Sequence, residues 1–154
     1  MIRTALLSAA TALAASLAMA EADPRAIQSC AQADPSFVAI EKCLPDADVA
    51  VRMLDLIATD AFFGAGGADL AQRCIALNDE KHGLTGAWAC ASNAIQAAIR
   101  LGRQLPEGTT LDDPLFTALN RPTLQEPLET AEDAARDRHP DKSFWGGTMY
   151  RPLK

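Results

Sequence analysis

Residues 68–105 read ADLAQRCIALNDEKHGLTGAWACASNAIQAAIRLGRQL. The apolar pattern of this stretch is interrupted once, by a polar cluster at residues 78–83, which is typical of a turn. Cys74 lies eight residues before His82, and Cys90 lies eight residues after it. Because two antiparallel helices rise equally from such a turn, the two cysteines arrive at the same height. We therefore predict a helical hairpin that a disulfide can close.

The second arm of this hairpin carries small side chains at the spacing of one helix face. Its alanines recur at i, i+4, i+7 and i+11, at Ala87, Ala91, Ala94 and Ala98. Such a stripe lets a neighbouring helix approach closely, and Trp88 adds bulk beside it. We interpret this arm as the central core helix rather than as the wall of a ligand groove, with Thr85 as its N-cap.

Residues 1–20, MIRTALLSAATALAASLAMA, have the three parts of a secretory signal peptide. Arg3 supplies the positive start, residues 5–18 are uncharged and rich in Ala and Leu, and Ala18-Met19-Ala20 fits the cleavage rule. Cleavage there makes Glu21 the mature N-terminus. The apolar run is shorter than a spanning helix of about 20 residues, so we favour a cleaved signal over a retained anchor. We expect a periplasmic or secreted bacterial protein without a membrane span in its mature chain.

The charge balance argues against nucleic acid as a partner. The chain of 154 residues has 14 basic and 20 acidic side chains and a formal net charge of −6, which becomes −7 once Arg3 is removed. Nucleic acid and anionic membrane surfaces repel a protein of this charge. The mature length suits one domain, and its acidity suits solubility or a basic partner.

The mature sequence holds four cysteines: Cys30, Cys43, Cys74 and Cys90. An even number in an exported chain predicts two disulfides, and of the three possible pairings we favour 30–43 and 74–90. Each closed loop contributes about 3 kcal/mol in the chain-entropy model. A metal site is the alternative, but the sequence has no CxxC and no nearby Cys/His cluster. We expect no metal, no haem and no other cofactor.

Asp-Pro pairs predict helix starts, because Asp caps a helix and proline fits its first position. They occur at Asp23-Pro24, Asp34-Pro35 and Asp113-Pro114, with Glu126-Pro127 as a weaker fourth. From the first two pairs we predict helices over residues 24–31 and 35–44, with a third helix over 47–61.

The helix predicted over residues 47–61 has one polar stripe, made by Asp48, Arg52, Asp55 and Thr59. We interpret the stripe as a solvated face with an Arg52–Asp55 ion pair, rather than as an acid/base site. The glycine-rich run at residues 62–67 is predicted to end this helix. It is not a phosphate loop, because it lacks the GK[ST] ending and follows no predicted strand.

The composition changes after residue 105, and six prolines lie between residues 106 and 154. We predict a short helix over 114–120 and a polar helix over 127–138 that packs weakly as an exposed arm. No segment alternates as a strand does. The predicted fold class is therefore all-α: a signal peptide, a small disulfide-stapled helical bundle over residues 21–105, and a proline-rich, partly irregular C-terminal extension over 106–154.

The central hairpin resembles the cysteine-paired helical region of LprI-type lysozyme inhibitors and related small exported proteins. The shared features are the long gap between Cys74 and Cys90, and a Thr followed by a large apolar residue and then Cys, here Thr85, Trp88 and Cys90. The acidic, Asn and Tyr positions that follow the second cysteine in that family are Ala, Ile and Arg here. The resemblance covers under a third of the chain and implies a helical module that binds another protein, without assigning any inhibitory residue.

Catalytic motifs are missing from the sequence, including a serine nucleophile elbow and HExxH. We expect His82 and His139 to be exposed polar residues rather than bases. The sequence therefore predicts a non-enzymatic, exported protein-binding or accessory protein, inhibitor-like or subunit-like, with an unidentified protein partner.

The predicted partner-binding residues lie in the last segment: Phe144, Trp145, Tyr150 and Arg151. Trp, Tyr and Arg are the residue types most often found as binding hot spots. The same segment could instead fold back and cover an apolar groove on the bundle. A small helical ligand carrier is the alternative function, and a closed apolar cavity of several hundred Å³ would favour it.

Overall fold

The computed structural model describes residues 21–78, 82–109 and 111–142. These residues form six α-helices and one short 3-10 helix, and no strand occurs among them, which confirms the predicted all-α class. The elements are α1 (Pro24–Ala33), α2 (Phe37–Thr59), α3 (Gly64–Asn78), α4 (Gly83–Gln104), α5 (Pro114–Leu119), η1 (Pro122–Leu124) and α6 (Gln125–Arg136). The predicted signal peptide and the segment from residue 143 lie outside the described residues.

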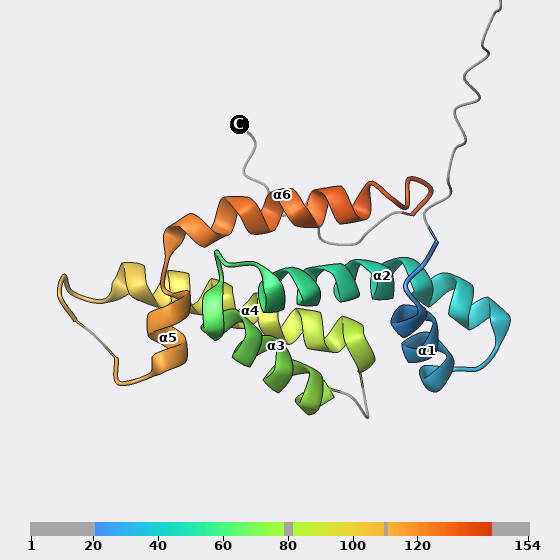
Figure 1. Ribbon diagram of the computed structural model, residues 1–154, viewed down its shortest axis with the longest axis horizontal. Helices are drawn as coiled ribbons and strands as arrows, with labels where there is room; N and C mark the ends of the chain where they lie inside the picture. The colour runs from blue at the N-terminus through green and yellow to red at the C-terminus, as the bar shows by residue number, and fades with distance from the viewer. Residues whose placement is uncertain (1–20, 79–81, 110, 143–154) are drawn as a thin grey trace, which may run out of the picture.

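The helix α2 is the centre of the fold, because it contacts α1, α3, α4 and α6. The helices α3 and α4 form the predicted hairpin below it, and α6 lies along its other side (Figure 1). The short α5 packs against α3 and α4, and α1 packs against α2 and α4. None of the described helices has the length and hydropathy that crossing a bilayer requires.

Both predicted disulfides form, which confirms the local pairing. Cys30 and Cys43 join α1 to α2 with their Cα atoms 5.8 Å apart, and Cys74 and Cys90 join α3 to α4 with a separation of 5.7 Å. Cys74 belongs to the main core, whereas Cys30 belongs to a smaller buried cluster between α1 and α2. The two bridges therefore secure different parts of the molecule.

The predicted small stripe on α4 is buried as expected. Ala87, Ala91 and Ala98 lie in the main core, and Ala94 packs against it as a partly buried residue. Trp88 is also buried beside the stripe. These side chains let α2 and α3 approach α4 closely.

The helices predicted over 35–44 and 47–61 are one continuous helix, α2, so the predicted break between them is wrong. Pro45 lies inside it. Proline removes one backbone hydrogen bond, the one to the carbonyl of Glu41, and Glu41 is exposed so that water can satisfy that carbonyl. Burial of the following turns, from Ala47 to Leu54, stabilises the helix beyond this point.

Two of the predicted caps also differ. Asp23 and Asp113 cap α1 and α5 as expected, but α2 starts at Phe37, with Ser36 as its cap instead of Asp34. The helix α4 starts at Gly83, before Thr85, and its own N-cap residue makes no side-chain hydrogen bond. Instead Leu84 N donates to Oγ of Ser29 on α1, at 3.2 Å. A neighbouring helix thus supplies the cap that the sequence assigned to Thr85.

The glycine-rich run does not end the helix that precedes it. The helix α2 ends at Thr59, and α3 begins at Gly64, which has a φ of +60°. Gly67 lies where α3 crosses the end of α2: a Cβ there would lie 2.1 Å from the carbonyl oxygen of Ile57 and 2.5 Å from Cβ of Phe63. The run therefore allows close backbone packing at this crossing.

The helix α6 is packed more tightly than a weakly held arm. Leu124 before it and Leu128 and Ala135 within it are buried in the main core. It begins at Gln125, two residues before the predicted start, because η1 leads directly into it. Few apolar side chains are therefore enough to hold α6, because Leu124, Leu128 and Ala135 all lie in the main core.

Candidate functional site

Asp48 is the only polar side chain that is buried among the described residues, with 1% of its surface exposed. It lies on α2, in a run of small and β-branched residues, Ala47, Val49, Ala50 and Val51, that are buried as well. A buried carboxylate is costly unless it is paired and hydrogen-bonded, so its partners decide what it does.

Four groups surround this carboxylate. Arg52, one turn along α2, donates from Nε at 3.0 Å to Oδ2 and from Nη2 at 3.3 Å to Oδ1. The Nε2 atom of His139 lies 3.0 Å from Oδ2, and Nε of Arg138 lies 3.7 Å from it. The backbone N–H of Asp23 donates to Oδ1 at 3.2 Å. We call these five residues the Asp48 cluster.

The electrostatics of the cluster favour the ionised carboxylate. Burial alone would raise the pKa of Asp48, but the hydrogen bonds from Arg52, His139 and the Asp23 backbone hold this pKa below its usual range. Each carboxylate oxygen already accepts two hydrogen bonds. The cluster is therefore built to hold structure together, and the carboxylate has little capacity left for a substrate or a metal ion.

The lowered pKa predicts how stability depends on pH. Because the folded-state pKa lies below the unfolded value of about 3.9, the ionised carboxylate stabilises the fold above that pH, and this contribution is lost as the pH falls through the lower value. We expect Asp48→Asn to be less stable than wild type by about 2 kcal/mol at neutral pH. The difference should shrink below pH 4 in urea denaturation series, and a difference that stays constant down to pH 2 would contradict this assignment.

The cluster corrects two predictions from the sequence. His139 was expected to be exposed, but it is bonded to Asp48 and its side chain is only 19% exposed. The stripe on α2 was expected to be solvated with an Arg52–Asp55 pair, but Arg52 pairs with Asp48. His82 is exposed, as predicted.

Asp55 has a different partner, on α1. Nη2 of Arg25 lies 2.6 Å from Asp55 and 2.8 Å from Asp23, so one guanidinium bridges α2 and the cap of α1. The hydrogen bonds to Asp55 and Asp23 raise the pKa of Arg25. They also leave this exposed side chain fixed at the edge of a groove.

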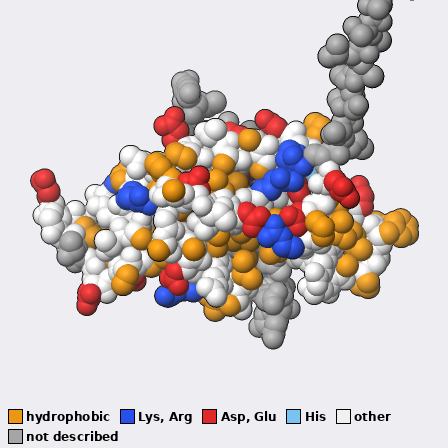
Figure 2. All heavy atoms as spheres, in the orientation of Figure 1, with side chains coloured by type: hydrophobic (Ala, Val, Ile, Leu, Met, Phe, Trp, Pro, Cys, Tyr) orange, Lys and Arg blue, Asp and Glu red, His pale blue; other side chains and the backbone are white. Residues whose placement is uncertain are grey.

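We call this groove the α1–α3 groove. It is formed by two adjoining cavities of about 250 and 350 Å³, which share Arg25, Ile75 and Leu84 in their walls. Its apolar floor comes from α2 and α3, with Val51, Leu54, Ala58, Ala68 and Ala71. Figure 2 shows hydrophobic side chains beside a group of acidic and basic ones on the face formed by α2 and α3. Ile75 stands at the edge of both cavities and is 39% exposed.

Two further hollows have more polar walls. One of about 310 Å³ lies between α4 and α6, and one of about 400 Å³ lies between α2 and the segment after α6. All of these hollows open onto the surface. A small helical ligand carrier would need a closed apolar cavity instead.

The structure brings together the four predicted cysteines as two bridges. The predicted partner-binding residues Phe144, Trp145, Tyr150 and Arg151 lie outside the described residues. Within the described ranges, no group of three or more His, Cys, Asp or Glu side chains is arranged to hold a metal ion. Sequence reasoning missed both the Asp48 cluster and the α1–α3 groove.

Comparison of the chain with models of protein families, with curated proteins and with solved structures finds no match. The resemblance of the hairpin to LprI-type inhibitors therefore stays a prediction.

Proposed function

We propose that this chain is an exported, non-catalytic protein that binds another protein through the α1–α3 groove. The observation that carries the proposal is the groove itself, an apolar floor walled by four helices with exposed Ile75 at its edge. Helical segments of partner proteins commonly place their apolar face in grooves of this kind.

The rim of the groove suits a partner that combines apolar and polar side chains. Gln28 and Gln32 on α1 and Gln72 on α3 line its walls and can bond to polar groups of a bound segment. Arg25 and Asp55 neutralise each other, so this ion pair forms part of the groove's edge and does not require a charged ligand. The net negative charge of the chain favours association with a basic partner.

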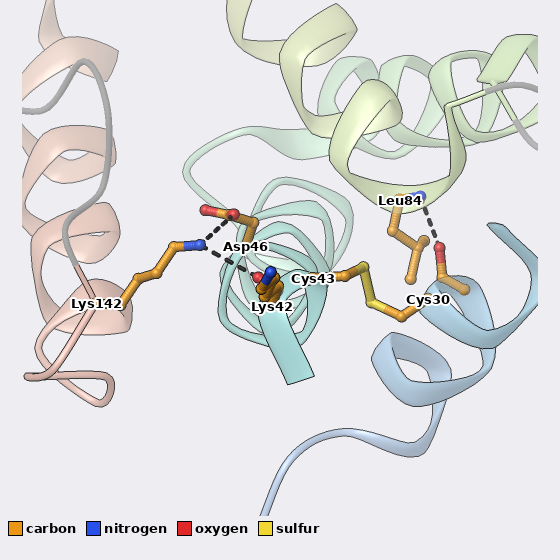
Figure 3. Close-up of a disulfide and its surroundings, with 7 residues drawn as sticks. Cys30, Lys42, Cys43, Asp46, Leu84 and Lys142 are labelled. Carbon is orange, nitrogen blue, oxygen red and sulfur yellow. Dashed lines mark hydrogen bonds and ion pairs between the residues drawn. A yellow bond between two sulfur atoms is a disulfide. The ribbon is translucent and has the colours of Figure 1, made fainter. Parts of the chain in front are cut away.

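The aromatic and basic residues Phe144, Trp145, Tyr150 and Arg151 are the second proposed contact. They follow Lys142, whose Nζ lies 3.0 Å from Asp46 and donates to the carbonyl of Lys42 at 3.2 Å (Figure 3). Lys142, which comes just before these residues in the sequence, is thereby attached to α2.

Export is supported by the two disulfides, which are typical of proteins that fold in an oxidising compartment. The signal-peptide pattern of residues 1–20 supports the periplasm or the outside of the cell as this compartment. The resemblance of the hairpin makes a lysozyme one named partner to include in binding tests.

The test is capture of a partner by the full chain, expressed with a C-terminal tag and purified from the periplasm. The intact mass of the purified protein should correspond to a chain that begins at Glu21. We expect Ile75→Arg to lower capture at least tenfold, because a charge at the edge of the apolar floor opposes docking. Leu77→Arg is the matched control: Leu77 lies on the same helix and is 78% exposed, but it does not line the groove. Both variants should melt within a few degrees of wild type.

A variant that ends at Lys142 separates the two proposed contacts, because it keeps the bonds to Asp46 and Lys42. Weakened capture with an unchanged melting temperature supports binding by the tail. If Ile75→Arg captures the same partner as strongly as Leu77→Arg does, the groove is not the binding site.

A further inference from the structure

The Asp48 carboxylate joins parts of the chain that are distant in sequence. Its Oδ1 accepts from the backbone of Asp23, immediately before α1, and its Oδ2 is bonded to His139, three residues after the end of α6. These partners lie 25 and 91 residues from Asp48 in the sequence. One side chain on α2 thus contacts both ends of the described chain.

Both ends lie on the body through exposed or half-buried residues and polar bonds to α2. None of residues 137–142 is buried. Their bonds to α2 include the contacts of Arg138 and His139 with Asp48 and those of Lys142 with Asp46 and Lys42. At the other end, residues 21–23 are also unburied, and the start of α1 is bonded to α2 by Asp23 N on Asp48 and by the exposed guanidinium of Arg25 on Asp55. The end of α1 is held separately, by the Cys30–Cys43 disulfide shown in Figure 3.

We propose that Asp48 is a latch: its negative charge holds the start of α1 and residues 137–142 on α2 together, and loss of that charge releases both segments while the core of α2, α3 and α4 stays folded. Such a latch fixes the position of residues 137–142 on α2. The latch does not depend on the proposed function, because it concerns the free protein.

The charges in the cluster explain why both ends should be released together. Arg52, Arg138 and His139 all face the same carboxylate, from α2 and from the segment after α6. Without it the two guanidiniums oppose each other across the site, and the attraction that holds residues 138 and 139 on α2 is lost. Asp23 N loses its charged acceptor at the same time, since a neutral amide binds a donor less strongly than a carboxylate does.

The main core stays folded when the two ends are released, because it is held together by other residues. The main cluster includes Met53, Ile57, Ile95 and Ile99, which do not belong to the Asp48 cluster. The Cys74–Cys90 bridge closes this part of the fold. Opening of the two ends is therefore a local event rather than global unfolding.

Hydrogen–deuterium exchange of the full mature chain tests the latch, with Asp48→Asn compared with wild type. Asparagine has nearly the same shape as aspartate, so the change removes the charge with little change in packing. We expect residues 21–26 and residues 137–142 to lose most of their protection against amide exchange, whereas residues 88–99 stay strongly protected and exchange faster only by about 30-fold, the factor that the lower global stability of the variant implies. Asp69→Asn is the control, because Asp69 forms an exposed pair with Arg73 on α3 and should change neither segment.

A second variant tests the C-terminal arm of the latch by itself. His139→Gln with Arg138→Gln removes the C-terminal partners but keeps Asp48 and Asp23, so it should loosen residues 137–142 and leave residues 21–26 protected. The latch is overturned if Asp48→Asn loosens only one end or neither end. It is also overturned if residues 88–99 lose as much protection as the ends do, because Asp48 would then be an ordinary part of the cooperative core.

Discussion

Replacing Cys74 and Cys90 by serine is expected to lower the melting temperature by roughly 10 °C or more, because loss of a native disulfide from a small domain costs about 2–5 kcal/mol. The bridge joins α3 to α4, and Cys74 is 1% exposed within the main core. Its removal frees the two arms of the hairpin in the unfolded chain and places serine hydroxyls at the packed junction of two helices.

The Cys30→Ser/Cys43→Ser variant is the matched comparison. The closed loops are similar, with sequence separations of 13 and 16 residues, so the chain-entropy model predicts nearly the same loss for both. The difference comes from location, because Cys30 and Cys43 hold α1 on a small separate cluster. We expect that loss of this bridge partly detaches α1 and lowers the main transition less.

Scanning calorimetry of both double variants under non-reducing conditions measures the two effects. The prediction is contradicted if the Cys30/Cys43 variant melts at the lower temperature. Thiol labelling of the native wild type should find no reactive cysteine, in agreement with the two bridges.

Gly67→Ala is expected to destabilise the fold by about 3 kcal/mol, although the same change inside a helix normally stabilises it by up to about 1 kcal/mol. The added Cβ would lie 2.1 Å from the carbonyl oxygen of Ile57, which is backbone and cannot rotate away. The helices α2 and α3 must therefore separate, and Phe63 and Ile57 lose packing contacts where both are buried.

Urea denaturation of Gly67→Ala measures this effect, with Ala65→Ser as the control. Ala65 is an exposed residue in the same turn of α3, so its substitution should change the free energy of unfolding by less than about 0.5 kcal/mol. A Gly67→Ala variant as stable as the wild type would show that α2 and α3 do not cross closely at this glycine.

Local signals in the sequence were sufficient for the hairpin and its disulfide. The polar turn, the equal spacing of Cys74 and Cys90 from it, and the alanine stripe of α4 all act between near neighbours, and each is confirmed. The Asp-Pro caps at Asp23 and Asp113 are confirmed for the same reason, because a cap bonds within its own first turn.

Contacts between distant segments could not be predicted in this way. Asp48 has the spacing of a solvated stripe, and nothing near it in sequence shows that residues 138 and 139 cover it. The break predicted between residues 44 and 47 does not occur, because burial of the turns that follow Pro45 keeps α2 continuous. The cap of α4 is Ser29, more than fifty residues away, so the local choice of Thr85 was wrong.

The α1–α3 groove could not be predicted either, because its walls come from four helices. Ile75 and Leu77 both look like ordinary apolar residues of α3 in the sequence. Only the arrangement of α1 and α2 around α3 places Ile75 at the edge of a cavity and leaves Leu77 on the open surface.

Site-specific photo-crosslinking in the periplasm tests the proposed groove most directly. A photo-reactive amino acid is placed at position 75 in one variant and at position 77 in another, in the full chain with its disulfides intact. The groove predicts one discrete crosslinked adduct from position 75 and little or none from position 77, although Leu77 is the more exposed of the two. An adduct of equal yield at both positions, or one formed only from position 77, would contradict binding in the α1–α3 groove.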